Sequence, residues 1–146
     1  MKNKKLLLAT ISYVVLTMAI AYPWHMMWFH DLYEGMGAYT RSEPNILLGM
    51  LSMLVQGVAI AYLYPFFYQA GNPVIQGIKF SIIVGSVVYS VMGFAMAAKI
   101  DINPISTYLL YNLVFQFIQF VLTGTVLGLI YGKIDKKHNH YLQRTV

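Results

Sequence analysis

The sequence predicts an all-α protein, a four-helix transmembrane bundle with both termini cytoplasmic and a short interfacial helix after the first span. The chain of 146 residues contains four long apolar runs, at 6–22, 46–68, 74–98 and 105–131, and the only formal charge within them is Lys79. A bilayer core of about 30 Å needs about 20 residues of helix. A helix also satisfies its own backbone hydrogen bonds, which lipid cannot do. The runs therefore predict one membrane domain, 1–146, with four spans.

The charges of the chain, Lys79 included, fall unequally on the two sides of the predicted membrane. Eight Lys and Arg side chains and a single acid, Asp135, belong to the side of the two termini, whereas two basic and four acidic side chains belong to the other side. Short flanking segments rich in Lys and Arg stay in the cytoplasm. We therefore expect a multi-pass protein of the bacterial cytoplasmic (inner) membrane, with both termini in the cytoplasm.

Composition excludes several classes of function. The isoelectric point of about 9.4 could indicate nucleic acid, but the basic excess lies at the helix ends. Positive-inside topology and anionic headgroups explain such an excess, so we expect membrane lipids as partners and no nucleic acid. The chain has no cysteine, which excludes disulfides, thiolate metal sites and thiol redox chemistry.

The first run is predicted to be a membrane helix that ends near Pro23. A basic start and an apolar run also begin a secretory signal, but this run is long and ends in Tyr22-Pro-Trp24 rather than in small residues at a cleavage site. The proline ring removes a backbone donor and kinks any continuation. Segment 24–39 mixes two Trp and two Tyr with Met, His and charge, which suits the headgroup level. An interfacial helix is therefore expected there.

Two of the other runs, 46–68 and 105–131, carry recognisable helix starts. Pro44 and Pro104 fit a first helical turn, and Glu43 and Asp101 lie close to the positive dipole end of the helix that each precedes. The segment 71–73, Gly-Asn-Pro, predicts a tight turn between the second and third helices. We therefore expect those two helices to pack against each other as an antiparallel pair.

Small residues recur every four positions on the fourth helix, at Gly124, Gly128 and Gly132. Such a stripe lets two backbones approach closely in lipid. It is predicted to face another helix, either inside the bundle or in a homo-oligomer or membrane-protein partner. Lys79, about one turn inside the third helix, is expected to extend its ammonium group to the cytoplasmic headgroups.

Segment 24–39 also holds the side chains with the most chemistry: His25, His30, Asp31 and Glu34, with Met residues beside them. On a helix, His30 and Glu34 would share one face at i, i+4. Imidazole with carboxylate can bind Zn²⁺, imidazole with thioether can bind copper, and a histidine can ligate haem. His25 and His30 are the metal candidates, although spacing five is no recognised metal motif. Another binding role and plain interfacial anchoring are the alternatives.

A polar face runs down the fourth helix, where Asn112, Gln116, Gln119 and Thr123 step by four, three and four. At membrane depth these groups need partners, which means either hydrogen bonds between helices or a functional site. A mostly apolar cavity with a few polar groups suits a small hydrophobic ligand. The predicted ligand site lies in the outer half of the bundle and consists of His25, His30, Glu34, Tyr108, Asn112 and Gln116.

Residues 28–38, Trp28-Phe-His-Asp-Leu-Tyr-Glu-Gly-Met-Gly-Ala38, resemble the Trp, Leu-Tyr and Met-Gly-x-Ala run of the tryptophan-rich sensory protein (translocator protein) family. That resemblance implies a fold of five helices and the binding of porphyrins and sterols. The chain departs from it, because the spacing from Trp to Leu-Tyr is one residue longer and the family's later aromatic and Pro pattern is missing. We carry no residue role over from this family.

The whole chain is similar to small four-helix bacterial membrane proteins of unknown function. Those proteins carry a Pro and aromatic cluster after the first helix, here Tyr22-Pro-Trp24 and Trp28-Phe29. This resemblance implies a fold and a location, and no activity.

Three classes of function stay open on the sequence. The leading one is a membrane protein without enzymatic activity, either an accessory subunit or a binder of a lipid or small hydrophobic ligand. The second is a small oligomeric transporter or pore, although the compact four-helix multidrug exporters need an acid in the first helix and 6–22 contains none. The third is a haem- or metal-binding membrane protein that uses His25 and His30 at the outer face. No cofactor can be named from the sequence.

Overall fold

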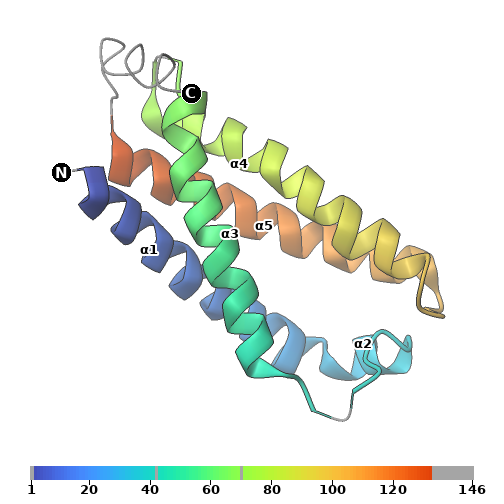
Figure 1. The fold of residues 1–146 in the computed structure, drawn as a ribbon. Coiled ribbons are helices and arrows are strands. Elements are labelled where there is room, and N and C mark those ends of the chain that lie inside the picture. The colour runs from blue at the N-terminus through green and yellow to red at the C-terminus, as the bar shows by residue number, and fades with distance from the viewer. Residues whose placement is uncertain (1, 42, 70, 133–146) are drawn as a thin grey trace.

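The structure is a computed structural model that describes residues 2–41, 43–69 and 71–132 (Figure 1). Four of its helices are long and apolar enough to cross a membrane: Asn3–Trp28, Ile46–Phe67, Pro73–Ala95 and Ile105–Tyr131. The described part of the chain has no strand, so the predicted all-α class with four membrane-length helices is confirmed. The elements in chain order are α1 (Lys2–Tyr22), η1 (Pro23–Trp28), α2 (His30–Gly35), α3 (Ile46–Phe67), α4 (Pro73–Tyr89), η2 (Ser90–Ala95) and α5 (Ile105–Tyr131).

The first helix does not end at Pro23, contrary to the sequence prediction. It continues as η1, a π-helical segment, in which the N–H of Phe29 donates to the carbonyl of Trp24 at 3.1 Å. A proline is tolerated inside a membrane helix where a local π adjustment satisfies the freed backbone groups again. Only the six residues His30–Gly35 form a separate short helix, α2, after it.

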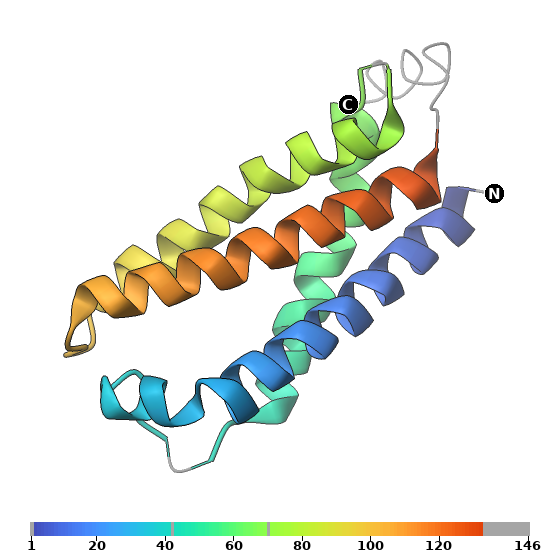
Figure 2. The same ribbon diagram turned by 180° about the vertical axis from the view of Figure 1, so that it is seen from behind.

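The helices pair differently from the prediction as well. α4 lies along α5 over most of its length, and α1 lies against α3 and α5 (Figures 1 and 2). α3 and α4 follow each other in sequence but make few contacts beyond the turn that joins them. A tight turn fixes only the two helix ends that it connects. Which helices pack along their length depends on the small residues, and the closest approaches between two backbones lie between α4 and α5.

Glycines bring α4 and α5 into backbone contact along a line that we call the seam, formed by Gly77, Gly124 and Gly128 with the backbone of 73–78. A Cβ atom on Gly77 would overlap the carbonyl of Gly124, and a Cβ atom on Gly128 would lie 2.5 Å from the carbonyl oxygen of Pro73. No ordinary side chain fits in such a space. Gly124 and Gly128 therefore serve a helix of the same chain, and a partner could reach them only if α4 left α5.

Gly132 does not belong to the seam. It caps α5 with φ 61°, a left-handed conformation that favours glycine, and a Cβ atom there would meet nothing within 4 Å. Its N–H donates to the carbonyl of Gly128 at 2.9 Å. The third glycine of the predicted stripe thus ends the helix and makes no helix contact. The basic tail beyond it, with His138 and His140, lies outside the described residues.

A tyrosine from α5 compensates for a proline inside α3. Pro65 has no N–H, so the carbonyl of Ala61 loses its partner in the helix. The hydroxyl of Tyr131 donates to that carbonyl at 2.6 Å, and both residues are buried. The bond joins α5 to α3 near the end of the bundle that carries the N-terminus (Figure 2).

Buried residues form two separate hydrophobic clusters, one toward each end of the bundle. The cluster nearer the N-terminus draws on all four long helices and consists of Ala9, Tyr13, Ile60, Ala61, Tyr64, Tyr68, Phe80, Phe120, Leu127 and Tyr131. The other, which we call the aromatic cluster, joins η1 and α2 to α5 and consists of Trp24, Tyr33, Met36, Ile102, Tyr108 and Phe115. A backbone bond from the N–H of Asn103 to the carbonyl of Met36, at 3.0 Å, ties the two loops together at that end.

Candidate functional site

The polar face of α5 is buried, and one of its four residues, Gln119, forms bonds to other helices. The amide Nε2 of Gln119 donates to Thr17 Oγ1 at 3.1 Å and to the Tyr13 hydroxyl at 3.3 Å. The Tyr13 hydroxyl in turn donates to Gln56 Oε1 at 2.6 Å. Gln119, Tyr13 and Thr17 are all buried, so this network ties α1, α3 and α5 together within the apolar spans. Such bonds fit the structural reading of buried membrane polarity.

Gln116 and Thr123, on the same face, have no side-chain hydrogen-bond partner among the described residues, and neither does Ser81 on α4. Only 7% of Gln116 is exposed, and its Oε1 atom is buried without a partner. Its neighbour Asn112 instead uses its Nδ2 to donate to the carbonyl of Tyr108, one turn back on the same helix, at 3.0 Å. A buried amide that makes no hydrogen bond costs about 1 to 3 kcal/mol. It therefore needs an explanation other than stability.

Gln116 lies in the wall of a narrow cavity of about 130 Å³ between α4 and α5, which we call the slot. The slot is lined by Ile82, Gly85, Ser86, Tyr89, Leu113, Gln116, Phe117 and Phe120. Two of its other polar groups are already bonded: Ser86 Oγ donates to the carbonyl of Ile83 at 2.7 Å, and the Tyr89 hydroxyl donates to the carbonyl of Leu109 at 3.1 Å. Among these lining side chains, only Gln116 offers an unpaired polar group.

Aromatic rings fill the space where the sequence predicted a cavity between segment 24–39 and α5. The ring centroids of Trp24 and Phe115 are 5.8 Å apart, and those of Tyr33 and Tyr108 are 6.1 Å apart. The Trp24 indole N–H donates to the Tyr33 hydroxyl at 3.3 Å, and the Tyr108 hydroxyl donates to the carbonyl of Met92 at 2.7 Å. Burial raises the pKa of Tyr33 to about 12, and the bond from Trp24 offsets part of that rise.

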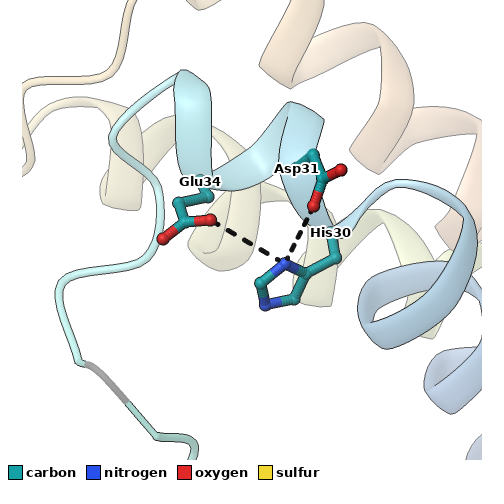
Figure 3. Close-up of side chains that lie close together, drawn as sticks. All are labelled: His30, Asp31 and Glu34. Carbon is teal, nitrogen blue, oxygen red and sulfur yellow. Dashed lines mark hydrogen bonds and ion pairs between the residues drawn. The ribbon is translucent and has the colours of Figure 1, made fainter.

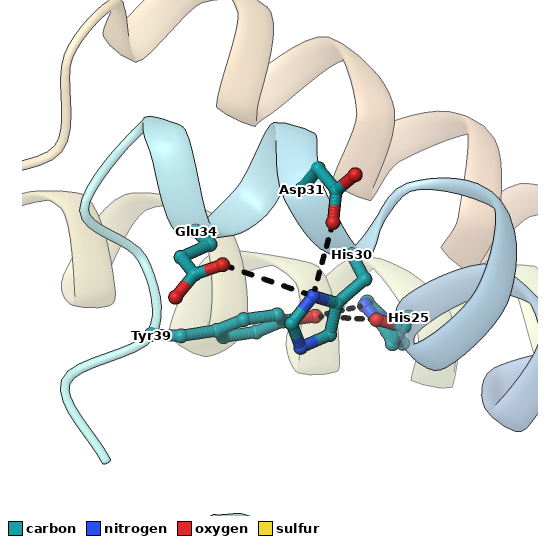
Figure 4. Close-up of polar contacts among 5 residues, drawn as sticks. All are labelled: His25, His30, Asp31, Glu34 and Tyr39. Atoms are coloured by element: carbon teal, nitrogen blue, oxygen red, sulfur yellow. Dashed lines mark hydrogen bonds and ion pairs between the residues drawn. The ribbon is translucent and has the colours of Figure 1, made fainter. Parts of the chain in front are cut away.

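His25 belongs to this aromatic packing and not to a cluster of metal ligands. Its ring lies 4.7 Å from the ring of Phe115 and 5.0 Å from that of Tyr33. The Tyr39 hydroxyl lies 3.3 Å from His25 Nδ1 and 3.2 Å from the His25 carbonyl oxygen (Figure 4). Burial raises the pKa of Tyr39, so its hydroxyl stays protonated. Tyr39 therefore holds the His25 imidazole in place against α5.

His30, Asp31 and Glu34 lie together on the exposed side of α2, with both carboxylates turned toward the imidazole (Figure 3). His30 Nδ1 is 3.4 Å from Asp31 Oδ1 and 3.9 Å from Glu34 Oε2. One ligand atom from each of the three residues lies within 4.8 Å of the other two. Beside them opens a pocket of about 240 Å³ lined by Met26, His30, Glu34, Ala38, Tyr39, Thr40, Arg41 and Pro44.

The six residues predicted to form one ligand site thus lie in three places. His30 and Glu34 lie on the exposed side of α2, His25 and Tyr108 contribute to aromatic packing, and Asn112 and Gln116 lie on α5. The spacing on α5 predicts a polar face, but it does not show that Gln116 borders α4. The slot residues from α4, among them Gly85 and Tyr89, were missed as site residues because the sequence does not show which residues of two helices border one cavity.

Comparison with known proteins adds no name to this geometry. No protein-family model, no curated protein and no solved structure matches the chain. The two likenesses drawn from the sequence therefore stay resemblances, and the function has to be argued from the residues themselves.

Proposed function

We propose that the protein is a membrane protein without enzymatic activity that binds a lipid chain or a small hydrophobic ligand in the slot between α4 and α5. The observation that carries the proposal is the unpaired Gln116 amide in the wall of an otherwise apolar cavity. Ligand sites combine apolar walls with a small number of polar groups that fix orientation. A ligand that pairs with Gln116 would also relieve the cost of an unsatisfied buried amide.

The chemistry of the slot indicates the class of ligand. Its lining is almost entirely apolar, and it offers one amide, which can donate from nitrogen or accept at oxygen. An aliphatic or aromatic molecule with one hydroxyl group matches this arrangement. The cavity of about 130 Å³ holds only part of such a molecule, and the rest would extend into lipid.

A photoreactive alcohol tests this proposal directly. A diazirine-bearing octanol should label slot residues such as Ile82, Leu113 and Phe117 in a saturable way, with labelled positions read by mass spectrometry. The matched probe is a diazirine alkane of equal length without the hydroxyl, which should label the slot more weakly. Gln116→Leu should reduce labelling by the alcohol and leave labelling by the alkane unchanged. Unsaturable labelling spread over the apolar surface would overturn the proposal.

The protein is proposed to lie in a bacterial inner membrane with both termini in the cytoplasm. In this orientation η1 and α2 lie at the headgroup level of the outer side. The unequal distribution of Lys and Arg supports it. So does the exposure of Met27 and Trp28, which are 64% and 69% exposed at the end of the first span. Reporter fusions at Val146 and at Gly37 should read cytoplasm and exterior, respectively. An exterior signal at Val146 would reverse the orientation.

A homo-oligomer or a membrane-protein partner is also part of the proposal, though not through the glycine stripe. Gly124 and Gly128 are in contact with α4, so a partner would bind another face of the bundle. The mass of the purified protein in detergent, measured by light scattering with the detergent subtracted, distinguishes a monomer from an oligomer. A monomer under all mild extraction conditions would count against self-association.

A further inference from the structure

We infer that His30, Asp31 and Glu34 form a binding site for a divalent transition-metal ion such as Zn²⁺ on the exposed side of α2. This site is separate from the slot and does not depend on the proposed function. It differs from the sequence prediction, which paired His30 with His25. Here both carboxylates belong to the site and His25 does not.

The distance between His30 Nδ1 and Asp31 Oδ1 already suits a tetrahedral ion. With metal–ligand bonds of about 2.0 to 2.2 Å, two ligand atoms of a tetrahedral site lie about 3.3 to 3.5 Å apart. His30 Nδ1 and Asp31 Oδ1 are 3.4 Å apart, and His30 Nδ1 and Glu34 Oε2 are 3.9 Å apart. All three ligand atoms lie within 4.8 Å of one another, so binding of an ion requires the Glu34 carboxylate to move closer to the other two ligands.

The three side chains come from one turn of helix, which explains why they converge. Glu34 lies at i+4 from His30 and therefore on the same face of α2, and Asp31 reaches the imidazole from the adjacent position (Figure 3). Exposed ion pairs contribute little to stability, because solvent screens them and ordering the side chains costs entropy. Asp31 and Glu34 are mostly exposed, so their pairing with His30 adds little to stability and leaves both carboxylates open to an ion.

The ligand types select a class of ion. One imidazole nitrogen with two carboxylates suits Zn²⁺ and its first-row neighbours, whereas Ca²⁺ and Mg²⁺ prefer six or more oxygen ligands. Three protein ligands leave one tetrahedral position for water. The pocket of about 240 Å³ beside His30 and Glu34 gives that water room. Arg41 also lines this pocket, and its positive charge would oppose the binding of a cation there.

His25 is excluded from the site by its contacts. Its Nδ1 faces the Tyr39 hydroxyl at 3.3 Å, and its ring packs on Phe115 (Figure 4). Removing His25 should therefore leave metal binding intact. This separates the inferred site from the haem or metal site that the sequence suggested.

Calorimetric titration with Zn²⁺ alone tests the inference on the full chain in detergent, purified without a histidine tag. His138→Ala and His140→Ala are present in every variant, because the tail histidines could bind metal themselves. We expect one Zn²⁺ per chain, with affinity at least tenfold weaker in His30→Ala and in Glu34→Gln. The matched controls Glu43→Gln and His25→Phe should bind like the parent. Arg41→Ala should tighten binding.

A second measurement keeps the result independent of heat signals. Co²⁺ in place of Zn²⁺ should give the intense visible bands of tetrahedral coordination, and these should disappear in His30→Ala. Circular dichroism should show the same helicity in all variants, since the three ligands are at the surface. The inference fails if the parent binds no stoichiometric Zn²⁺, if His30→Ala binds equally well, or if His25→Phe removes the site.

Discussion

The seam and the slot are two stretches of one interface, between α4 and α5, and they are built differently. At the seam, glycines let backbone meet backbone: a Cβ atom on Gly124 would lie 2.5 Å from the Cα of Ile78. At the slot, side chains separate the helices and leave a cavity of about 130 Å³ beside an unpaired Gln116. The difference teaches that one helix pair can be closely packed in one stretch and leave an unpaired buried amide beside a cavity in the next.

The largest expected loss of stability comes from a bulky side chain that forces α4 and α5 apart at the seam. Gly128→Leu would force its side chain into the backbone of α4 at Pro73 and Val74. We expect a loss of about 3 kcal/mol of stability, the upper range for overpacking a close contact. Thermal or denaturant unfolding in detergent measures this. Gly49→Leu is the matched control, because a Cβ atom at Gly49 meets nothing within 4 Å. Equal stability of the two variants would contradict the role of the seam.

A smaller loss is expected when the polar network beside the slot is broken. Gln119→Leu removes the donor to Thr17 and Tyr13, both of which are buried. The Tyr13 hydroxyl keeps its bond to Gln56, so losing the two bonds from Gln119 should cost about 1 to 2 kcal/mol, at the level of single hydrogen bonds in membrane bundles. Thermal unfolding, monitored through the loss of helicity, measures the change in stability. A neutral result would mean that this network does not hold α1 to α5.

The bond between Tyr131 and Ala61 should matter only because Pro65 is present. Tyr131→Phe removes the donor to the Ala61 carbonyl and should cost about 1 kcal/mol. In a Pro65→Ala background the helix can satisfy that carbonyl itself, so the same change should cost much less. A double-mutant cycle measures the coupling. If the two costs are equal, the tyrosine does not compensate for the proline.

The smallest expected effect is the loss of stability at alkaline pH, where Tyr33 in the aromatic cluster ionises. Burial raises the pKa of Tyr33 from its usual 10.0 to about 12, so folding favours the neutral phenol. This contribution to stability is complete below pH 10 and is lost as the pH rises toward 12. The phenolate absorbance of the parent minus that of Tyr33→Phe should therefore titrate near pH 12. A midpoint near 10 would show that Tyr33 is accessible to water.

Most of the fold follows from apolar length, whereas the pairing of helices does not. The runs predict four long helices because lipid leaves the backbone few other structures. The chain order suggested that the second and third helices pair, but Gly77 on α4 meets Gly124 on α5 and brings those two together instead. The continuation past Pro23 was missed for a related reason. A π-helical turn depends on local contacts that a proline rule does not include.

The candidate sites were predictable to different degrees. The spacing of His30 and Glu34 was enough to place them on one face, because both lie on one turn of helix. The position of Gln116 beside α4 and the burial of His25 against Phe115 depend on packing between distant segments. Sequence spacing shows which residues share a face, but it does not show which neighbour that face meets.

The measurement that tests the central claim most directly is the stability of Gln116→Leu, with and without octanol, beside Gln119→Leu. If Gln116 is kept for a ligand, Gln116→Leu should raise stability by about 1 kcal/mol in the absence of octanol, because it removes an unpaired buried amide. It should also abolish the stabilisation that octanol gives the parent, whereas Gln119→Leu should lower stability and keep the response. If Gln116→Leu instead destabilises the protein as much as Gln119→Leu and the octanol response persists, Gln116 is structural and the slot is not a ligand site.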